Sequence, residues 1–259
     1  MTPYTKFLLW MALVFVIICG GMYALATGAI SSGKTPWSVE RIQVQANQTL
    51  VEVGNWCSGT IIDSHNGLVV TAAHCVEKVH VKKSVKVTKP SGEVIIYKID
   101  RYDPLVVTLH KFDDEGNEIG FIKYTTRVLK AVYPQDIAVL QNVSGEPFTS
   151  NVVISLAKVR YGAHVFTVGN PLMFYGVVAE GKVIKPKHTL DVGSGPVTTI
   201  VFNSFMAPGS SGGGLFNDYG ELIGITNWGI QGGPYLASPI SNVIAVLNTL
   251  GLKEWHPLA

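Results

Sequence analysis

Apolar and polar positions follow two different patterns along the chain. From Phe7 to about Ile30 the residues are apolar or small and carry no charge, and Lys6 precedes this run. From residue 37 onward, short segments rich in Val, Ile and Thr alternate with turns that contain Gly, Pro, Asn or Asp. A long uncharged run predicts a helix, whereas short segments of the second kind predict β-strands. We therefore expect an all-β protein preceded by one apolar helix.

The N-terminal segment, residues 1–36, allows two interpretations. The run from Phe7 to Ile30 is longer than the roughly 20 residues that a helix needs to span a bilayer, which predicts a transmembrane anchor. If only its first part is the hydrophobic region, the segment is a signal peptide, for which Ala24-Leu25-Ala26 offers a cleavage site. The chain is then either membrane-anchored through this helix or secreted after cleavage of residues 1–26. Both interpretations place everything after about residue 35 outside the cytoplasm.

Two hairpins and one helix can be located from the pattern of the remaining chain. The segments Glu52–Ile62 and Leu68–Val70 predict two strands, joined by an Asn-Gly pair that favours a tight hairpin turn. A second hairpin joins Ser84–Thr88 to Val94–Ile99. Apolar residues at helical spacing in Ser241–Leu250 predict a short C-terminal helix.

Composition narrows the class of function. A net charge of +2 and a charged fraction of 15% give no reason to expect a nucleic-acid partner. The acidic segment Asp113–Asn117 could be a calcium loop, but it lacks the alternating ligand spacing of known loops and fits a solvated hairpin tip better. The histidines show no metal-ligand spacing, so we expect no metal and no organic cofactor.

The stretch Ala207–Gly214, with the sequence Ala-Pro-Gly-Ser-Ser-Gly-Gly-Gly, contains a candidate nucleophile. A catalytic serine needs an exposed hydroxyl, a neighbouring base and donors for the developing oxyanion. Glycines on both sides permit the tight turn that exposes the hydroxyl. This interpretation makes Ser211 the nucleophile and the N–H groups of Gly209 and Ser211 the oxyanion hole. On its own, the stretch would also fit a glycine-rich loop without chemistry.

A base and a carboxylate are found earlier in the chain. Val69–Cys75 is an apolar strand that runs into a turn of small residues presenting His74, and Asp136 opens the apolar segment Asp136–Leu140. With these motifs the chain resembles the trypsin-like (chymotrypsin-fold) serine proteases, whose catalytic residues occur in the order His, Asp, Ser. The resemblance implies that His74 is the general base, that Asp136 orients it and that Ser211 is the nucleophile.

A competing pattern lies in the same stretch, because Gly209–Gly213 also satisfies the G-x-S-x-G pattern of α/β-hydrolases. In that class a helix follows the serine directly, and the acid and the histidine come later, as Asp218 and His256 would here. However, Leu215–Trp228 predicts two strands joined by a turn at Asn217–Gly220, with no helical period. The α/β-hydrolase interpretation is therefore rejected.

The resemblance to trypsin-like proteases also implies a fold. It predicts two packed, antiparallel, six-stranded β-barrels: residues 37–147 with the histidine and aspartate, and residues 148–259 with the serine, the substrate strand and the C-terminal helix. It further implies a disulfide between Cys57 and Cys75, which would place the protein in an oxidising compartment.

The second half of the chain resembles one branch of the superfamily in particular. Val165–Pro171 followed by Gly176–Val183, together with Ala207–Gly209, resembles the HtrA branch. The chain stops at Ala259, so we expect no PDZ domain of the kind that many HtrA relatives carry.

The resemblance locates a substrate-binding region as well. Thr226, Asn227, Trp228 and Gly229 match the strand that pairs with the substrate backbone, and Phe205 and Met206 fall near the side-chain pocket. There is no aspartate there to select Lys or Arg, and no histidine in the strand to select Glu. We therefore expect a preference for an apolar or small side chain.

The expected function is that of a serine endopeptidase, which hydrolyses peptide bonds of protein substrates through an acyl-enzyme. Ser210 stands where zymogen-activated trypsins have an aspartate, and no activating N-terminal segment is present, so we expect no such activation step. The alternative is a catalytically silent protein of the protease fold that binds extended peptides or partner proteins.

Overall fold

The computed structural model describes residues 34–193, 195–229 and 233–252. The predicted anchor or signal segment lies outside these residues except for its last three positions. Among the described residues, no helix is long and apolar enough to cross a membrane. The chain forms two units, residues 1–36 and 37–259, and the architecture below is that of the second.

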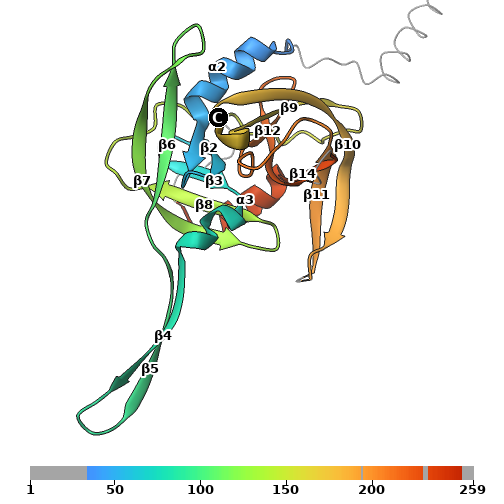
Figure 1. Cartoon of the computed structure of the whole chain (residues 1–259). Coiled ribbons are helices and arrows are strands. Elements are labelled where there is room, and N and C mark those ends of the chain that lie inside the picture. The colour runs from blue at the N-terminus through green and yellow to red at the C-terminus, as the bar shows by residue number, and fades with distance from the viewer. Residues whose placement is uncertain (1–33, 194, 230–232, 253–259) are drawn as a thin grey trace, which may run out of the picture. The chain divides into compact units, whose positions relative to one another are not determined.

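The first half of this unit is a closed antiparallel barrel with the strand order β1-β2-β3-β8-β7-β6 (Figure 1). Its strands are β1 (Leu50–Val53), β2 (Cys57–Asp63), β3 (Leu68–Thr71), β6 (Leu105–Phe112), β7 (Glu118–Val132) and β8 (Ile137–Asn142). The predicted hairpin is confirmed as β2 and β3, but the segment Glu52–Ile62 is not one strand. Gly54 and Asn55 adopt positive φ angles of 58° and 66°, which breaks the segment into β1 and β2.

The second half is another closed antiparallel barrel, with the strand order β10-β11-β14-β13-β12-β9 (Figure 1). Its strands are β9 (His164–Gly169), β10 (Val177–Asp191), β11 (Pro196–Phe202), β12 (Gly214–Asn217), β13 (Leu222–Gly229) and β14 (Tyr235–Pro239). The expected all-β fold with two six-stranded barrels is thus confirmed. The predicted C-terminal helix is present as α3 (Ile240–Asn248).

Each barrel has an apolar interior of its own, and a third apolar cluster joins the barrels. Strand alternation explains this, because successive side chains of a strand face opposite sides of the sheet. In β3, Val69 packs into the first barrel, whereas Leu68 and Val70 join the shared cluster. The shared cluster also contains Phe166 of β9 and Val243 of α3. The two barrels are therefore held together by continuous apolar packing.

Helix α2 (Val39–Thr49) precedes the first barrel and was not predicted. Its first turn is capped by Ser38, whose hydroxyl accepts a hydrogen bond from the Arg41 N–H at 3.4 Å. Ile42 and Ala46 lie on its buried face and belong to the cluster between the barrels. A serine cap followed by apolar residues four apart is a signal in the sequence for this helix.

The predicted hairpin around Ser84–Ile99 exists, but it forms a sheet of its own outside the barrel. Strands β4 (His80–Thr88) and β5 (Val94–Tyr102) pair only with each other and project from the first barrel as a ribbon (Figure 1). The acidic segment Asp113–Asn117 forms the β6–β7 turn, in which the Asp113 carboxylate accepts the N–H of Asn117 at 2.8 Å. This carboxylate is used to close the turn, as expected for a hairpin tip.

Candidate active site

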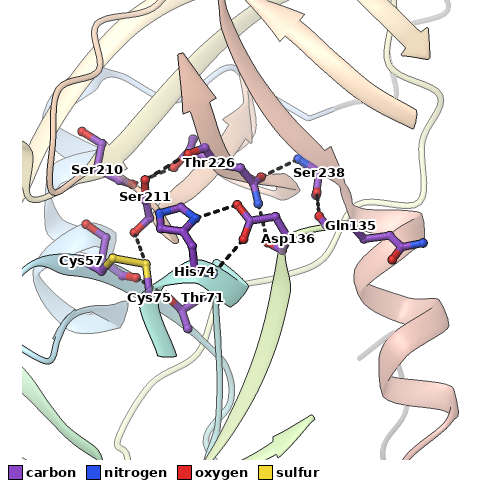
Figure 2. A network of polar contacts seen from close by, with 12 residues as sticks. Cys57, Thr71, His74, Cys75, Gln135, Asp136, Ser210, Ser211, Thr226 and Ser238 are labelled. Carbon is purple, nitrogen blue, oxygen red and sulfur yellow. Dashed lines mark hydrogen bonds and ion pairs between the residues drawn. A yellow bond between two sulfur atoms is a disulfide. The ribbon is translucent and has the colours of Figure 1, made fainter. Parts of the chain in front are cut away.

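His74 and Asp136, 62 residues apart in the chain, lie in direct contact (Figure 2). His74 follows β3 in the 3-10 helix η1 (Ala73–Val79), and Asp136 ends the turn before β8. The His74 Nδ1–H donates to Asp136 Oδ2 at 2.8 Å, and the His74 backbone N–H donates to Oδ1 at 2.9 Å. Because both carboxylate oxygens are engaged by the same residue, the imidazole is held in one orientation with Nε2 directed away from the aspartate.

The environment of this pair raises the pKa of the His74 imidazole above its ordinary value. The main cause is the hydrogen bond to Asp136, and the charges of Asp136 and Glu77 add to it, while burial of the ring opposes it. The Asp136 side chain is 4% exposed and the His74 side chain 40% exposed. The imidazole is thus reachable from solvent, whereas the carboxylate that it contacts is not.

The loop that carries Asp136 is fastened by residues of the second barrel. The Asn227 amide donates to the backbone carbonyl of Asp136 at 2.5 Å, and the Ser238 N–H donates to Asn227 Oδ1 at 2.8 Å. The Ser238 hydroxyl also donates to the carbonyl of Gln135. Asp136 itself has a positive φ of 51°, which is unusual for a residue other than glycine. These bonds stabilise the strained turn that brings the carboxylate to His74.

Ser211 lies on the other side of the His74 ring in a loop between β11 and β12 (Figure 2). Gly209 and Gly212, which flank it, have positive φ angles of 103° and 88°. The Ser211 hydroxyl donates to the backbone carbonyl of Asn227 at 3.0 Å. No hydrogen bond of the described residues joins this hydroxyl to His74, although the structure brings all three predicted catalytic side chains to one place.

The orientation of the Gly209 N–H follows from the hydrogen bond made by the residue before it. The Pro208 carbonyl accepts the Leu172 N–H at 2.7 Å, and in a trans peptide the following N–H points the opposite way. The N–H of Gly209 therefore faces away from Leu172. Within the described part of the chain, neither this N–H nor that of Ser211 donates to a protein acceptor. The two predicted donors are thus available to an external anion.

Ser58, at the start of β2, was not predicted but connects the first barrel to this loop. It is fully buried. Its hydroxyl donates to the Gly209 carbonyl at 2.7 Å and accepts the N–H of Asn170 at 2.8 Å. Its backbone N–H donates to the Ser211 carbonyl at 2.8 Å. Nothing in the local sequence signals this role, because the partners of Ser58 lie more than 100 residues further along the chain.

The residues of the predicted substrate strand differ in burial and in hydrogen bonding. Thr226 is buried, and its hydroxyl donates to the Ser210 carbonyl at 2.8 Å, so this side chain supports the serine loop. The Asn227 side chain is hydrogen-bonded to the backbone of Asp136 and of Ser238. Trp228 is partly exposed and Gly229 is exposed. Of these four strand residues, the backbone of Asn227 together with Trp228 and Gly229 is left to face a substrate.

The predicted side-chain pocket is not open among the described residues. Met206 is buried in the interior of the second barrel, whereas Phe205 is 54% exposed. The cavity between Phe205 and Thr226 has a volume of about 10 Å³, which is room for one water molecule.

The predicted disulfide is present and excludes a metal site at this place. Cys57 and Cys75 are bonded, which closes the segment around His74. The ligand atoms of Cys57, His74 and Cys75 lie within 4.8 Å of one another, a spacing that would suit a metal ion. However, both sulfurs are consumed by the disulfide, and a metal needs the thiolate.

Two antiparallel six-stranded barrels, with a histidine–aspartate pair on one and a glycine-flanked serine on the other, define the architecture of a trypsin-like serine peptidase. Residues 57–225 match the sequence profile of the family described as Trypsin-like peptidase domain, and the chain belongs to this family. Membership of this family supports a protease.

Three relatives show which proteins of the family the chain resembles. It is 26% identical to "Serine protease HTRA2, mitochondrial" from Bos taurus, over 70% of this chain and 33% of the relative. It is 27% identical to "Serine protease Do-like HtrB" from Bacillus subtilis, over 51% of this chain and 31% of the relative. It is 37% identical to "Probable periplasmic serine endoprotease DegP-like" from Rhizobium meliloti, over 35% of this chain and 18% of the relative. The matched part thus spans about a third or less of the length of these relatives, and the expected HtrA features are confirmed.

Proposed function

We propose that this protein is a serine endopeptidase in which His74, Asp136 and Ser211 act together. The observation that carries the proposal is the hydrogen-bonded His74–Asp136 pair beside a serine loop with two unused N–H donors. A base oriented by a buried carboxylate, a serine and an oxyanion hole are the groups that acyl transfer to serine requires. No metal or organic cofactor takes part in this chemistry.

In the proposed reaction the Ser211 oxygen attacks the scissile carbonyl carbon while His74 Nε2 takes the hydroxyl proton. The N–H groups of Gly209 and Ser211 stabilise the negative oxygen of the tetrahedral intermediate. His74 then gives the proton to the leaving amine, and the acyl-enzyme is hydrolysed by water in the same two steps. Asp136 accepts the hydrogen bond from Nδ1–H and stabilises the imidazolium that forms in between.

In the proposed mechanism, the incoming substrate replaces the Ser211 hydroxyl as the hydrogen-bond donor to the Asn227 carbonyl. The Asn227 carbonyl lies at the end of β13, where an extended peptide would pair by main-chain hydrogen bonds along Trp228 and Gly229. When a substrate N–H donates to this carbonyl, the Ser211 hydroxyl loses its acceptor and turns towards His74. Substrate binding and activation of the nucleophile are thereby coupled.

The same bond is the observation that favours the second candidate, a silent protein that binds extended peptides. If the Ser211 hydroxyl remained on the Asn227 carbonyl, the loop would bind a peptide without attacking it. The hydrogen-bonded His74–Asp136 pair, with Ser211 on the other side of the His74 ring, makes the peptidase the preferred function.

We also propose that the folded unit acts outside the cytoplasm. The disulfide between Cys57 and Cys75 supports an oxidising compartment, and the name of the Rhizobium meliloti relative includes the word periplasmic. The apolar run in residues 1–36 would serve as the anchor or as the export signal. The preference for an apolar or small residue before the scissile bond remains a prediction.

A fluorophosphonate probe tests the proposed function, because it labels a serine only where a base and an oxyanion hole are assembled. We expect the full-length wild type to be labelled, and the Ser211→Ala and His74→Ala variants to remain unlabelled. His188→Ala is the matched control, since the structure uses only the backbone of His188 in a hydrogen bond. An unlabelled wild type that is folded and disulfide-bonded would refute the peptidase and favour the peptide-binding protein.

A further inference from the structure

A cavity of about 280 Å³ lies beside the oxyanion hole, and the proposed function does not yet use it. Its walls include Cys57, Pro208 and Gly209, whereas no residue of β13 lines it. The cavity is therefore next to the reacting centre, but on a different side from the strand proposed to bind the acyl half of the substrate.

This position identifies which part of a substrate can reach the cavity. In an extended peptide the two halves leave the scissile carbonyl in opposite directions. If the acyl half pairs along β13, the leaving half must pass Gly209 towards the Cys57–Cys75 disulfide. A side chain one or two residues after the scissile bond would then point into the cavity.

The inner wall of the cavity contains a buried carboxylate. In β1, Val51 and Val53 face the interior of the first barrel, and Glu52 between them faces outward, as strand alternation requires. Glu52 Oε1 accepts the Tyr175 hydroxyl at 3.4 Å, and Oε2 lies 3.4 Å from His110 Nε2. Both contacts are long for hydrogen bonds, although the side chain is only 9% exposed. The carboxylate oxygens can thus accept a further, stronger hydrogen bond.

A second carboxylate lies behind Glu52, outside the lining of the cavity. Glu118 Oε1 lies 3.1 Å from His110 Nδ1, so His110 is placed between two carboxylates. Burial raises the pKa of the Tyr175 hydroxyl, and the negative charges of Glu52 and Glu118 raise it further. No Lys or Arg is among the described residues that line the cavity, and the Lys78 ammonium lies 4.0 Å from the centre of the Trp56 ring.

The outer rim of the cavity is apolar. Leu172 and Met173 contribute to its lining and are 58% and 64% exposed. Both have positive φ angles, 53° and 65°, a strained conformation that is stored most often at functional sites. An apolar rim above a negative inner end suits a side chain with a long aliphatic stem and a cationic head.

We propose that this cavity binds a lysine or arginine side chain of the substrate on the leaving-group side of the scissile bond, with Glu52 as the acceptor of the cation. The proposal rests on the proposed function. Glu52 is then a specificity-determining residue: a cation supplies the strong donor that the carboxylate lacks, while the stem of the side chain covers Leu172 and Met173. A substrate with an acidic residue at this position is rejected, because it would meet a buried negative charge.

The test begins with the full-length wild type and a proteome-derived peptide library, with cleavage sites identified by mass spectrometry. Matched quenched peptides then differ only in the first or second residue after the cleaved bond, with Lys, Arg, Met, Gln or Glu at that place. We expect kcat/KM for the Lys or Arg peptide to exceed that for the Met or Gln peptide by about tenfold or more, as for a hydrogen bond to a charged group. Glu peptides should be the poorest substrates.

Two variants assign the preference to Glu52. In Glu52→Gln, which keeps the shape of the side chain, the Lys-to-Met ratio should fall to near one, whereas kcat/KM for the Met peptide changes little. Glu93→Gln is the control, since Glu93 binds Lys89 on the ribbon and does not line the cavity. This variant should retain the ratio. Glu52→Asp, which keeps the charge with a shorter reach, should retain part of it.

The outcomes separate this proposal from the proposed function. Equal cleavage of the Lys and Met peptides by the wild type overturns the proposal and leaves the peptidase intact, whatever the variants do. An unchanged ratio in a folded Glu52→Gln protein also overturns it. The absence of both cleavage and fluorophosphonate labelling refutes the proposed function instead.

Discussion

The Ser58 hydroxyl, in the first barrel, donates a hydrogen bond to the Gly209 carbonyl, in the second barrel, over 2.7 Å. The peptide group that follows Gly209 is therefore oriented by a residue of the opposite barrel. Since the Pro208 carbonyl is held by Leu172, both peptide groups next to the proposed oxyanion donor are fixed before a substrate arrives. Such preorganisation is the main source of catalytic stabilisation at oxyanion holes.

Ser58→Ala should impair both stability and turnover. The change leaves the Gly209 carbonyl and the Asn170 N–H without their partner inside the protein, which costs about 1–3 kcal/mol of the free energy of unfolding. The loosened loop should lower kcat by about tenfold or more, less than the loss of an oxyanion donor itself. Chemical denaturation and steady-state kinetics measure the two effects.

Ser64→Ala is the control for this substitution. Ser64 is also a first-barrel serine with a hydrogen-bonded hydroxyl, but its partner, Asn151, belongs to an exposed contact. This variant should keep wild-type kcat. If Ser58→Ala also keeps it, the hydroxyl has no part in positioning Gly209.

Asp136→Asn should lower kcat by about 10⁴-fold while the protein remains folded. An amide at this position no longer holds the His74 ring with Nδ1 protonated, nor does it stabilise the imidazolium formed during the reaction. The chain offers a second histidine–aspartate pair as a control. His80 Nε2 lies 2.6 Å from Asp100 on the exposed ribbon, so Asp100→Asn should leave kcat unchanged. Equal losses in the two variants would contradict the assignment.

The pH dependence of kcat/KM should show an acid limb with its midpoint above 6.5, the ordinary pKa of a histidine. General-base catalysis needs neutral His74, and the hydrogen bond to Asp136 raises the pKa of its imidazole. Activity is therefore lost as the pH falls through this raised pKa. A pH–rate profile with its midpoint below 6.5 would be incompatible with the observed pair.

The same pKa shift has the opposite effect on stability. A group whose pKa is higher in the folded protein stabilises it fully below the unfolded value of about 6.5, and this contribution disappears as the pH rises through the folded value. The His74–Asp136 pair should thus stabilise the protein most in mild acid, where it is least active. Denaturation of wild type and Asp136→Asn at several pH values measures this difference.

Gly212→Ala should be far more damaging than a comparable change elsewhere. A Cβ at this position would lie 2.1 Å from the Ser58 carbonyl oxygen and 2.2 Å from Thr71 Oγ1, in addition to the strain of a φ of 88°. We expect a loss of more than about 3 kcal/mol and an inactive loop. Gly116→Ala measures the cost of backbone strain without a steric clash, since the φ of Gly116 is 83° and no atom lies within 4 Å of the added Cβ. That variant should lose only about 1–2 kcal/mol, as measured by urea denaturation.

The parts of this protein that could be predicted from sequence have local signals. His74, Asp136 and Ser211 each stand in a short motif, and the structure brings them together. The barrels and helix α3 follow from apolar periodicity and from the family resemblance. The disulfide also follows from that resemblance.

The parts that could not be predicted depend on contacts between distant segments. Ser58 looks like an ordinary strand residue until Gly209 and Asn170 are placed beside it. Thr226 and Asn227 match a substrate strand by position, but their side chains are used by the Ser210 and Asp136 backbones. The alternation of β1 shows that Glu52 points out of its barrel, but not that a cavity lies there.

The distribution of the site over both barrels has a consequence for how the protein would lose activity. The proposed base sits on one barrel and the proposed nucleophile on the other, and the bonds made by Ser58, Asn227 and Ser238 all cross between them. A separation of the barrels by less than the length of one hydrogen bond would break this arrangement without disturbing either sheet. On heating, catalytic activity should therefore be lost at a lower temperature than β-structure. Activity would then measure the contact between the two barrels rather than the folding of each barrel.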